Sequence, residues 1–240
     1  MIRVGTAGWS IPRALAACAP GTGSHLERYS RQLNAVEINS SFYRPHAFAT
    51  YKKWADATPP DFRFAVKVPR TITHELKLRR PRMELERFLA ETGGLGFKRG
   101  PLLVQLPPSH AFDRRVVARF FEHFRSRHEG AIVCEPRHAT WFAAPAERLL
   151  EAYQVARVAA DPSVAPGASQ PGGWKDLQYF RLHGSPRMYW SRYSMDAIRV
   201  LAGTLHASTA VDAWCVFDNT AMGSALDNAC ELMTHIDPLP

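Results

Sequence analysis

The stretch LLVQLPPSHAFDRRVVARFFEHF, residues 102–124, decides the fold class. It begins with an apolar run at residues 102–106 and continues, from residue 116 to residue 124, with apolar residues at helical spacing. Asp113 stands just before this second pattern, where its carboxylate can cap the first turn of a helix. The stretch therefore predicts a strand that is followed by a helix.

The same order of strand and helix is repeated along the chain. Eight apolar or β-branched runs have the length of strands: residues 2–6, 35–38, 64–68, 102–106, 131–134, 156–160, 177–182 and 213–217. Amphipathic helical patterns separate most of them, and they lie at residues 48–55, 116–124, 146–153, 198–205 and 226–233, with Ser24, Ser194 and Ser224 as further predicted N-caps. This alternation predicts a mostly parallel sheet.

Eight strands favour closure of the sheet into a barrel. An open doubly wound sheet usually has a Gly-rich first turn, and GTAGWS at residues 5–10 lacks the GxGxxG spacing. We therefore expect one (β/α)8, TIM-barrel-like domain over residues 1–240. The sixth unit is the exception, because PSVAPGASQPGGWK at residues 162–175 carries three prolines and three glycines and predicts an irregular loop without a regular helix. A second loop, residues 70–81, is basic and polar.

Composition limits the class of protein and its partners. Hydrophobic residues make up 46% of the 240 residues and charged residues 22%, which is typical of a globular domain and excludes a disordered chain. No signal peptide and no run of about 18 apolar residues is present, so we expect a cytoplasmic protein without a membrane partner. The net charge of +8 favours an anionic partner, either a small molecule or nucleic acid. The sequence does not indicate an oligomeric state.

Eight motifs carry a family resemblance. They are GTAGWS (5–10), VEINSSFYR (36–44), DFRFAVKVPRTITHELKL (61–78), GPLLVQLPPS (100–109), EPRHATWF (135–142), YFRLHG (179–184), RYS (192–194) and VFDNTAMGSALDNA (216–229). In this order they resemble the YecE-like family, also known as domain of unknown function 72. The resemblance implies a TIM-barrel-like fold and implies no activity. The motif match is also the main reason to include the loop residue His74 among the site residues.

The candidate catalytic residues lie at strand ends, because the C-terminal ends of parallel barrel strands converge on one face. They are Glu37, Lys67, Glu135 and His183. Glu37 and Glu135 are candidates for general acid and base, since neighbouring cations and partial burial can separate their proton affinities. Lys67 is also a candidate for a Schiff-base lysine.

The candidate substrate-binding residues are polar or aromatic side chains at the strand ends and on the rim: Asn39, Tyr43, His74, Gln105, Arg137, Arg181, Tyr193 and Asn219. Two interpretations of the charged members stay open. Lys67, Arg137, Arg181 and His183 could surround the oxygens of a phosphate or carboxylate. Alternatively, Glu37, Lys67, Glu135 and Arg181 form a structural ion network that fills the upper barrel.

A divalent metal is a further alternative, which we do not favour. Acidic residues and one histidine follow five different strands and could together bind a metal ion: Glu37, Glu135, Asp161, His183 and Asp218. No HExxH or EF-hand spacing is present, and the neighbouring Lys and Arg side chains would compete for the carboxylates.

Three functions are consistent with these residues. The first is an enzyme of hydrolase or lyase type that acts on an anionic, phosphate-bearing substrate in a pocket at the C-terminal ends of the strands. The second is a nucleic-acid-binding or repair-type protein that uses basic and aromatic residues on the rim. The third is a noncatalytic barrel that binds a ligand.

Overall fold

A computed structural model of the protein describes residues 1–236. Ten strands are present in this range: β1 (Ile2–Thr6), β2 (Ala35–Ile38), β3 (Arg63–Lys67), β4 (Arg99–Gln105), β5 (Ile132–Glu135), β6 (Val155–Arg157), β7 (Ala159–Asp161), β8 (Gly172–Gly173), β9 (Leu177–Leu182) and β10 (Asp212–Phe217). They form two sheets, of order β1-β10-β9-β7 and β2-β3-β4-β5-β6-β8. All pairs are parallel except β6 with the two-residue strand β8. The predicted α/β fold with parallel sheets is confirmed.

Two local features connect the sheets. Val158 alone separates β6, which pairs with β5, from β7, which pairs with β9. On the other side, Ala7 forms a parallel bridge with Glu37, next to β1 and within β2. Each of the eight predicted runs therefore overlaps with a strand, and the sixth run overlaps with both β6 and β7. The strands form two separate hydrogen-bonded sheets rather than one continuous sheet, and the sixth run is divided between them.

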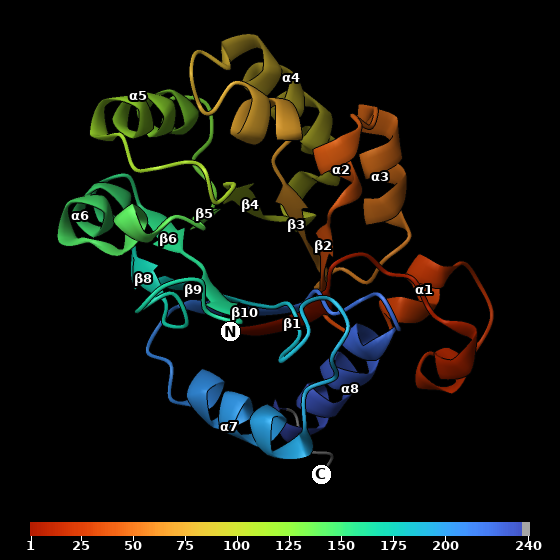
Figure 1. The fold of residues 1–240 in the computed structure, drawn as a ribbon. Helices are drawn as coiled ribbons and strands as arrows, with labels where there is room; N and C mark the ends of the chain where they lie inside the picture. Colours follow the sequence, from red (N-terminus) through yellow and green to blue (C-terminus); the bar gives the residue numbers. More distant parts are fainter. Residues whose placement is uncertain (237–240) are drawn as a thin grey trace.

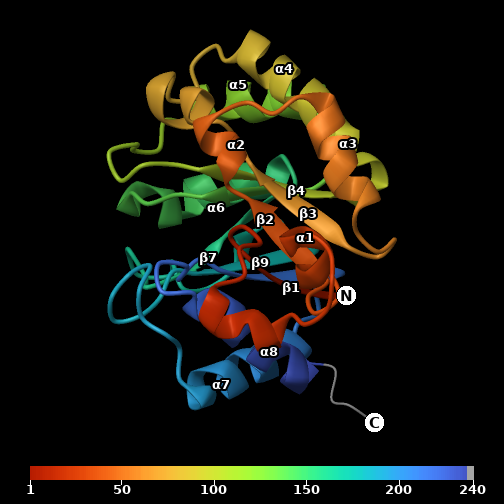
Figure 2. The ribbon, with the colours of Figure 1, turned by 90° about the vertical axis from the view of Figure 1, so that its right-hand side faces the viewer.

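Helices lie outside the strands (Figure 1). The α-helices are α1 (His25–Tyr29), α2 (Ser40–Tyr43), α3 (Phe48–Asp56), α4 (Arg82–Thr92), α5 (Arg114–Arg125), α6 (Ala144–Ala152), α7 (Met195–His206) and α8 (Ser224–Ile236). Shorter turns of helix are η1 (Arg13–Cys18), η2 (Thr71–Glu75), η3 (Gly93–Lys98) and η4 (Ala139–Phe142). Figure 2 shows α3, α4 and α5 on one side of the strands and α7 and α8 on the other. None of the helices described in residues 1–236 is long and apolar enough to cross a membrane.

The predicted connections agree with the structure in most places. The fully described stretch between β7 and β9 contains no helix, as predicted for the sixth unit. Ser24, Asp113 and Ser194 cap α1, α5 and α7 through their side chains, whereas Ser224 is the first residue of α8. The predicted loop at residues 70–81 includes the helical turn η2, and α4 follows directly although we predicted no helix there.

Two apolar layers hold the fold together. The larger layer lies between strands and helices and includes Val36, Ile38 and Val66. The smaller layer lies on the opposite, interior face of the strands and consists of Ala35, Ala65, Leu103, Val133, Ala156, Val158, Leu177, Tyr179, Trp214 and Val216. Because side chains alternate along a strand, a residue two positions after one of these interior residues also faces the interior. By this rule, the charged residues at the strand ends that follow these interior residues also face the interior.

Candidate functional site

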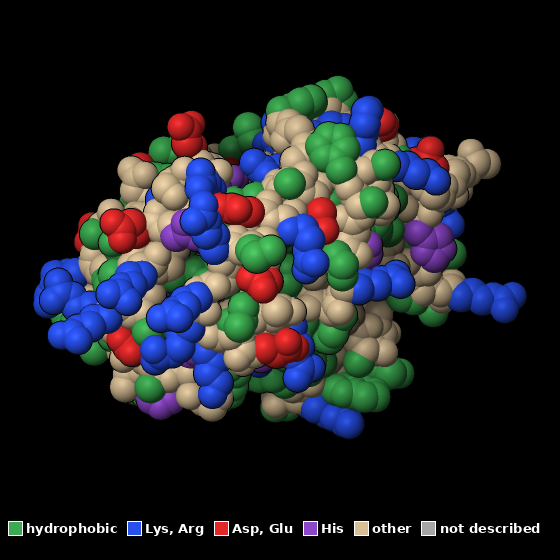
Figure 3. Space-filling view, turned by 90° about the horizontal axis from the view of Figure 1, so that it is seen from above, with side chains coloured by type: hydrophobic (Ala, Val, Ile, Leu, Met, Phe, Trp, Pro, Cys, Tyr) green, Lys and Arg blue, Asp and Glu red, His purple; other side chains and the backbone are tan. Residues whose placement is uncertain are grey.

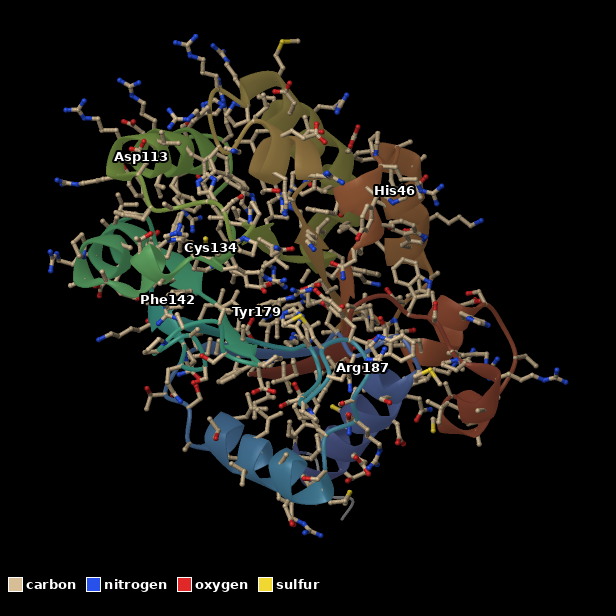
Figure 4. All side chains as sticks on the ribbon, viewed as in Figure 1. His46, Asp113, Cys134, Phe142, Tyr179 and Arg187 are labelled. Atoms are coloured by element: carbon tan, nitrogen blue, oxygen red, sulfur yellow. The ribbon has the colours of Figure 1, made fainter. Side chains whose placement is uncertain are left out.

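A layer of charged side chains lies directly beyond the interior apolar layer. Glu37, Lys67 and Glu135 follow Ala35, Ala65 and Val133 by two residues, and Arg181 follows Tyr179 in the same way. Tyr179 itself belongs to the interior apolar layer on β9, and its position is labelled in Figure 4. The strands thus bring candidates that are up to 144 residues apart in sequence into contact.

Arg181 lies at the centre of this layer and is fully buried. Its Nε donates to Glu37 Oε2 at 3.0 Å, and its Nη2 donates to Glu37 Oε1 at 2.8 Å. Nη1 donates to Glu135 Oε2 at 2.5 Å, and Nη2 also donates to Asp218 Oδ2 at 3.0 Å. One guanidinium therefore bonds three carboxylates. This ion network contains Glu37, Glu135 and Arg181 of the structural network considered from the sequence, but it includes Asp218 in place of Lys67.

His183 lies between two of these carboxylates. Its Nδ1 is 3.0 Å from Asp218 Oδ2, and its Nε2 is 3.1 Å from Glu135 Oε1. Arg137 donates from Nε to Glu135 Oε1 at 3.1 Å. Arg137 and Asp218 are the members of the network nearest to solvent, with side chains 15% and 13% exposed, compared with 1% or less for Glu37, Glu135, Arg181 and His183.

Burial and charge act in opposite directions on the proton affinities in the network. Burial opposes ionisation of Glu135, but Arg181 and His183 outweigh it and hold the pKa of that carboxyl well below its usual range. Burial is likewise outweighed by Arg181 at Asp218, whose pKa is lowered. Burial disfavours the imidazolium of His183, yet Glu135 and Asp218 raise its pKa. These shifts favour an imidazolium held between two carboxylates.

Lys67 shares the layer but not the network. Its side chain is buried, its Nζ lies 4.2 Å from the centre of the Phe42 ring, and it forms no ion pair within residues 1–236. Burial and the charge of Arg181 lower the pKa of Lys67 to about 8, although Glu37 and other carboxylates act in the opposite direction. Lys67 is thus a buried cation beside carboxylates that are already bonded to Arg181.

His74 packs against the same aromatic ring. Its imidazole packs edge to face on Phe42, with 5.0 Å between the ring centres, and its Nδ1 is 2.9 Å from Thr73 Oγ1. Burial, Lys67 and Arg70 lower the pKa of His74 to about 4. The loop residue that was included on the motif match therefore lies near the charged layer as a neutral imidazole.

The remaining predicted residues have separate positions. Asn39 has a buried Oδ1 without a hydrogen-bond partner in the described part of the chain, and Gln105 Nε2 donates to Leu106 O at 3.2 Å. Tyr43 is 77% exposed on the rim. None of these three side chains forms a hydrogen bond with the Arg181 network within residues 1–236, although Gln105 is the register partner of Glu135 on the adjacent strand.

Tyr193 and Asn219 hold loops rather than project from them. The Tyr193 hydroxyl donates to Asp161 Oδ2 at 2.6 Å and accepts from the Gly184 amide at 2.9 Å. Asn219 Nδ2 donates to Ser191 O at 2.9 Å. A role for Tyr193 or Asn219 in substrate binding stays a prediction.

Two residues of the network were not among the predicted site residues. Asp218 bonds both Arg181 and His183, and the Tyr179 hydroxyl donates to Glu37 Oε2 at 2.8 Å. Asp218 directly follows β10, so its position was a usable signal; we considered it only as a possible metal ligand and selected the neighbouring Asn219 for substrate binding. Tyr179 was hidden because a tyrosine within an apolar strand looks like a core residue.

No metal centre is evident in the described range 1–236. No group of three or more His, Cys, Asp and Glu side chains there has an arrangement that could hold a metal ion. The carboxylates that were considered for this role, Glu37, Glu135 and Asp218, all accept hydrogen bonds from Arg181. A metal ion would have to compete with that guanidinium.

Comparisons with known proteins agree with this fold. The UPF0759 protein YecE of Escherichia coli is 35% identical over 107 residues, which are 45% of this chain and only 38% of YecE. The UPF0759 protein YunF of Bacillus subtilis is 22% identical over an alignment of 277 positions, gaps included, that covers 99% of this chain and 95% of YunF.

Solved structures match almost the whole chain. A DUF72 family protein of Enterococcus faecalis has a TM-score of 0.83 at 20% identity and covers 100% of this chain and 97% of that one. A DUF72 family protein of Thermotoga maritima has a TM-score of 0.80 at 24% identity, with 98% of each chain covered. SacUVDE matches with a TM-score of 0.59 at 13% identity over 100% of both chains. At these identities the likeness concerns the fold alone.

A family model gives the assignment. The model for the protein of unknown function DUF72 matches residues 3–238, which is nearly the full length of the chain. The resemblance that the eight sequence motifs indicated is thereby confirmed. The chain belongs to the DUF72 family.

Proposed function

We propose that the chain is an enzyme of hydrolase or lyase type that acts on an anionic, phosphate-bearing substrate at the C-terminal ends of its strands. The observation that carries this proposal is the state of Lys67. A charge on a largely buried side chain that has no ion-pair partner within residues 1–236 is costly, and the carboxylates that could neutralise Lys67 are already bonded to Arg181. An anionic ligand beside Lys67 would remove that cost, so neutralisation of the lysine would contribute to the free energy of ligand binding.

The proposed site requires that the two sheets share one interior, as in a closed eight-stranded barrel. The continuity of β6 and β7 through Val158 supports this inference on one side. The bridge between Ala7 and Glu37 supports it on the other. In such a barrel the charged layer closes the end at which TIM-barrel enzymes carry their active sites.

We assign anion binding to Lys67 and Arg137. Lys67 supplies a point charge, and Arg137 supplies a planar fork that matches two phosphate oxygens. Within residues 1–236, Arg137 bonds one carboxylate, Glu135, and it has the most exposed side chain of the network, so part of its guanidinium can turn to a ligand.

Proton transfer is assigned to the pair of His183 and Asp218. The raised pKa of His183 keeps it protonated, and because its two ring nitrogens face Asp218 and Glu135, a proton that it gives up passes first to one of these carboxylates. Asp218 uses Oδ2 for both Arg181 and His183, and its other oxygen has no hydrogen-bond partner within residues 1–236. This free oxygen is the one that a substrate at the rim could reach.

Glu37 and Arg181 receive a positioning role in this proposal. Both carboxylate oxygens of Glu37 accept from Arg181, one of them also from Tyr179, and both side chains are fully buried. This departs from the expectation that Glu37 is an acid or base and that Arg181 binds the substrate directly. Glu135 keeps its assignment near the reacting groups through its contact with His183.

A binding screen tests the proposal. Inorganic phosphate and a panel of phosphorylated sugars, nucleotides and acids would be assayed by thermal shift, and each ligand that binds would be measured again with Lys67→Met. Lys53→Met removes the same charge from an exposed position on α3 and serves as the matched control. We expect Lys67→Met to weaken ligand binding at least tenfold, about 1.4 kcal/mol, and the control to leave it unchanged. Equal binding by both variants would refute the assignment of the anion site.

A further inference from the structure

The surplus positive charge of the chain is concentrated in two segments. Residues 77–82 and 113–127 contain nine of the 30 Lys and Arg residues but two of the 22 Asp and Glu residues. They therefore account for seven of the eight surplus positive charges. Figure 3 shows Lys and Arg side chains gathered on the side of the molecule formed by α5, at the left of that view.

The first turn of α5 carries cations where a helix disfavours them. Arg114 and Arg115 begin the helix, no acidic residue lies in its first turn, and Arg119 follows one turn later. The helix dipole and the i, i+4 spacing of Arg115 and Arg119 both make this arrangement unfavourable by a few tenths of a kcal/mol. Asp113 Oδ1 already accepts from the amides of Arg115 and Val116, so the exposed side chains, and not the helix end, define the surface.

The loop at residues 77–82 lies beside this helix. Arg79 Nη2 is 3.3 Å from Asp113 Oδ2, which ties the loop to the start of α5. Lys77, Leu78 and Arg80 all have positive φ angles, of 49°, 63° and 51°, a conformation that side-chain-bearing residues rarely adopt. In Figure 4, long nitrogen-tipped side chains extend into solvent around the labelled Asp113. The backbone of residues 77–80 thus has an unfavourable conformation in which the side chains of Lys77, Arg79 and Arg80 are exposed to solvent.

Most of these cations have no protein partner. Five exposed residues form no ion pair within residues 1–236: Lys77, Arg80, Arg114, Arg115 and Arg119. On the rim, Arg192 pairs with Asp227 and Glu231, whereas Arg44 and Arg187 form no ion pair within residues 1–236. Unpaired exposed cations therefore also occur elsewhere, but five of them lie together on α5 and its neighbouring loop.

We infer that the loop at residues 77–82 and the exposed side of α5 form a surface that binds the phosphodiester backbone of nucleic acid. Four of the five unpaired cations are arginines, whose planar donors match phosphate oxygens in pairs. A row of cations across two segments fits a repeating anion better than a single small one. This inference goes beyond the proposed function and does not depend on it, since Lys67 and its neighbours are not part of this surface.

Binding of oligonucleotides tests the inference. Fluorescence polarisation would measure the affinity of the full chain for labelled single-stranded DNA and for duplex DNA over a range of salt concentrations. The test variant is Arg114→Gln, Arg115→Gln and Arg119→Gln combined. The matched control is Lys52→Gln, Lys53→Gln and Lys175→Gln combined, which removes the same charge from exposed positions elsewhere. Polyglutamate is the competing anionic polymer.

We expect the arginine variant to bind the oligonucleotides at least tenfold more weakly, and its salt slope to fall by about 1 for each phosphate that it no longer binds. The control should change the affinity much less, and Lys67→Met should leave it unchanged. Equal losses of affinity in the two triple variants, or polyglutamate binding as tight as that of DNA, would overturn the inference. Failure of Lys67→Met to affect phosphate ligands would instead concern only the proposed function.

Discussion

Arg181 and Glu37 form a two-point ion pair in which both side chains are fully buried, with Nε to Oε2 at 3.0 Å and Nη2 to Oε1 at 2.8 Å. The same guanidinium bonds Glu135 and Asp218. Arg181 bonds all three carboxylates, whereas His183 bonds two and Arg137 one, so the stability of the charged layer depends on Arg181 more than on any single acid. The pair joins β2 of one sheet to β9 of the other.

Removal of this cation should destabilise the protein strongly. We expect Arg181→Met to lower the free energy of unfolding by about 3–5 kcal/mol, since it leaves buried carboxylates without compensation. Urea unfolding at pH 7 measures the change. Arg181→Lys should recover part of the stability, because it restores the charge without the two-point geometry.

The pH dependence of the stability loss in Arg181→Met distinguishes a lost electrostatic interaction from a packing defect. The lowered pKa values of Glu135 and Asp218 contribute stability above the unfolded-state pKa values, and that contribution is lost as the pH falls through the folded-state values. Arg181 causes much of the lowering, so the stability difference between Arg181→Met and the natural chain should narrow below about pH 4. A difference that stays constant from pH 7 to pH 3 would contradict the electrostatic explanation.

His183 should give the protein an opposite pH dependence near neutrality. Its folded-state pKa is raised, so its contribution to stability is fully present below the ordinary value of 6.5 and is lost as the pH rises through the folded-state pKa. We expect His183→Gln to be most destabilising at pH 5.5 and progressively less so up to pH 9. Urea unfolding at four or five pH values tests this, with His123→Gln on α5 as the control.

The strand periodicity predicted which residues face the interior. Glu37, Lys67 and Arg181 each lie between apolar neighbours, and this alternation alone placed them on one face of their strands. It could not predict which cation bonds which carboxylate. Arg181 and Glu37 are 144 residues apart, and their contact depends on how the two sheets are placed relative to each other. The isolation of Lys67 follows from the same arrangement, so the sequence could not reveal it.

The missed helix α4 had a different cause. Leu85, Phe88 and Leu89 have helical spacing, but they directly follow the basic stretch KLRRPR, which we interpreted as part of a loop. Pro81 stands immediately before α4, a position where proline is compatible with a helix start. For the inferred nucleic-acid-binding surface, α4 is relevant because it fixes the end of the basic loop beside α5. The basic composition of the preceding stretch led us to overlook the helical spacing of the apolar residues.

Asp218 should set the proton affinity of His183. Asp218→Asn keeps an oxygen that can accept from Arg181 and His183 but removes the charge that favours the imidazolium. We therefore expect the pKa of His183 to fall in this variant, while the free energy of unfolding changes by less than in Arg181→Met. A pH titration of the imidazole nitrogens by NMR measures the shift. Asp56→Asn, which alters an exposed ion pair on α3, is the control, and an unchanged His183 titration in Asp218→Asn would refute the coupling.

Lys67 should cost the unliganded protein stability. Its pKa of about 8, compared with 10.5 for a free lysine, means that the unfolded chain binds the proton more tightly than the folded one. Stability should therefore rise with pH between about 8 and 10.5, and the penalty at pH 7 is about 3 kcal/mol. We expect Lys67→Met to raise the free energy of unfolding at pH 7 by up to this amount, because methionine keeps the contact of the aliphatic stem with Phe42 and removes the charge. The gain should shrink towards pH 10.5, whereas Lys53→Met should give a small change at every pH. If Lys67→Met is more stable than the natural chain but no longer binds phosphate ligands, the charge of Lys67 serves ligand binding. If Lys67→Met instead loses stability by an amount that does not depend on pH, Lys67 is a structural cation.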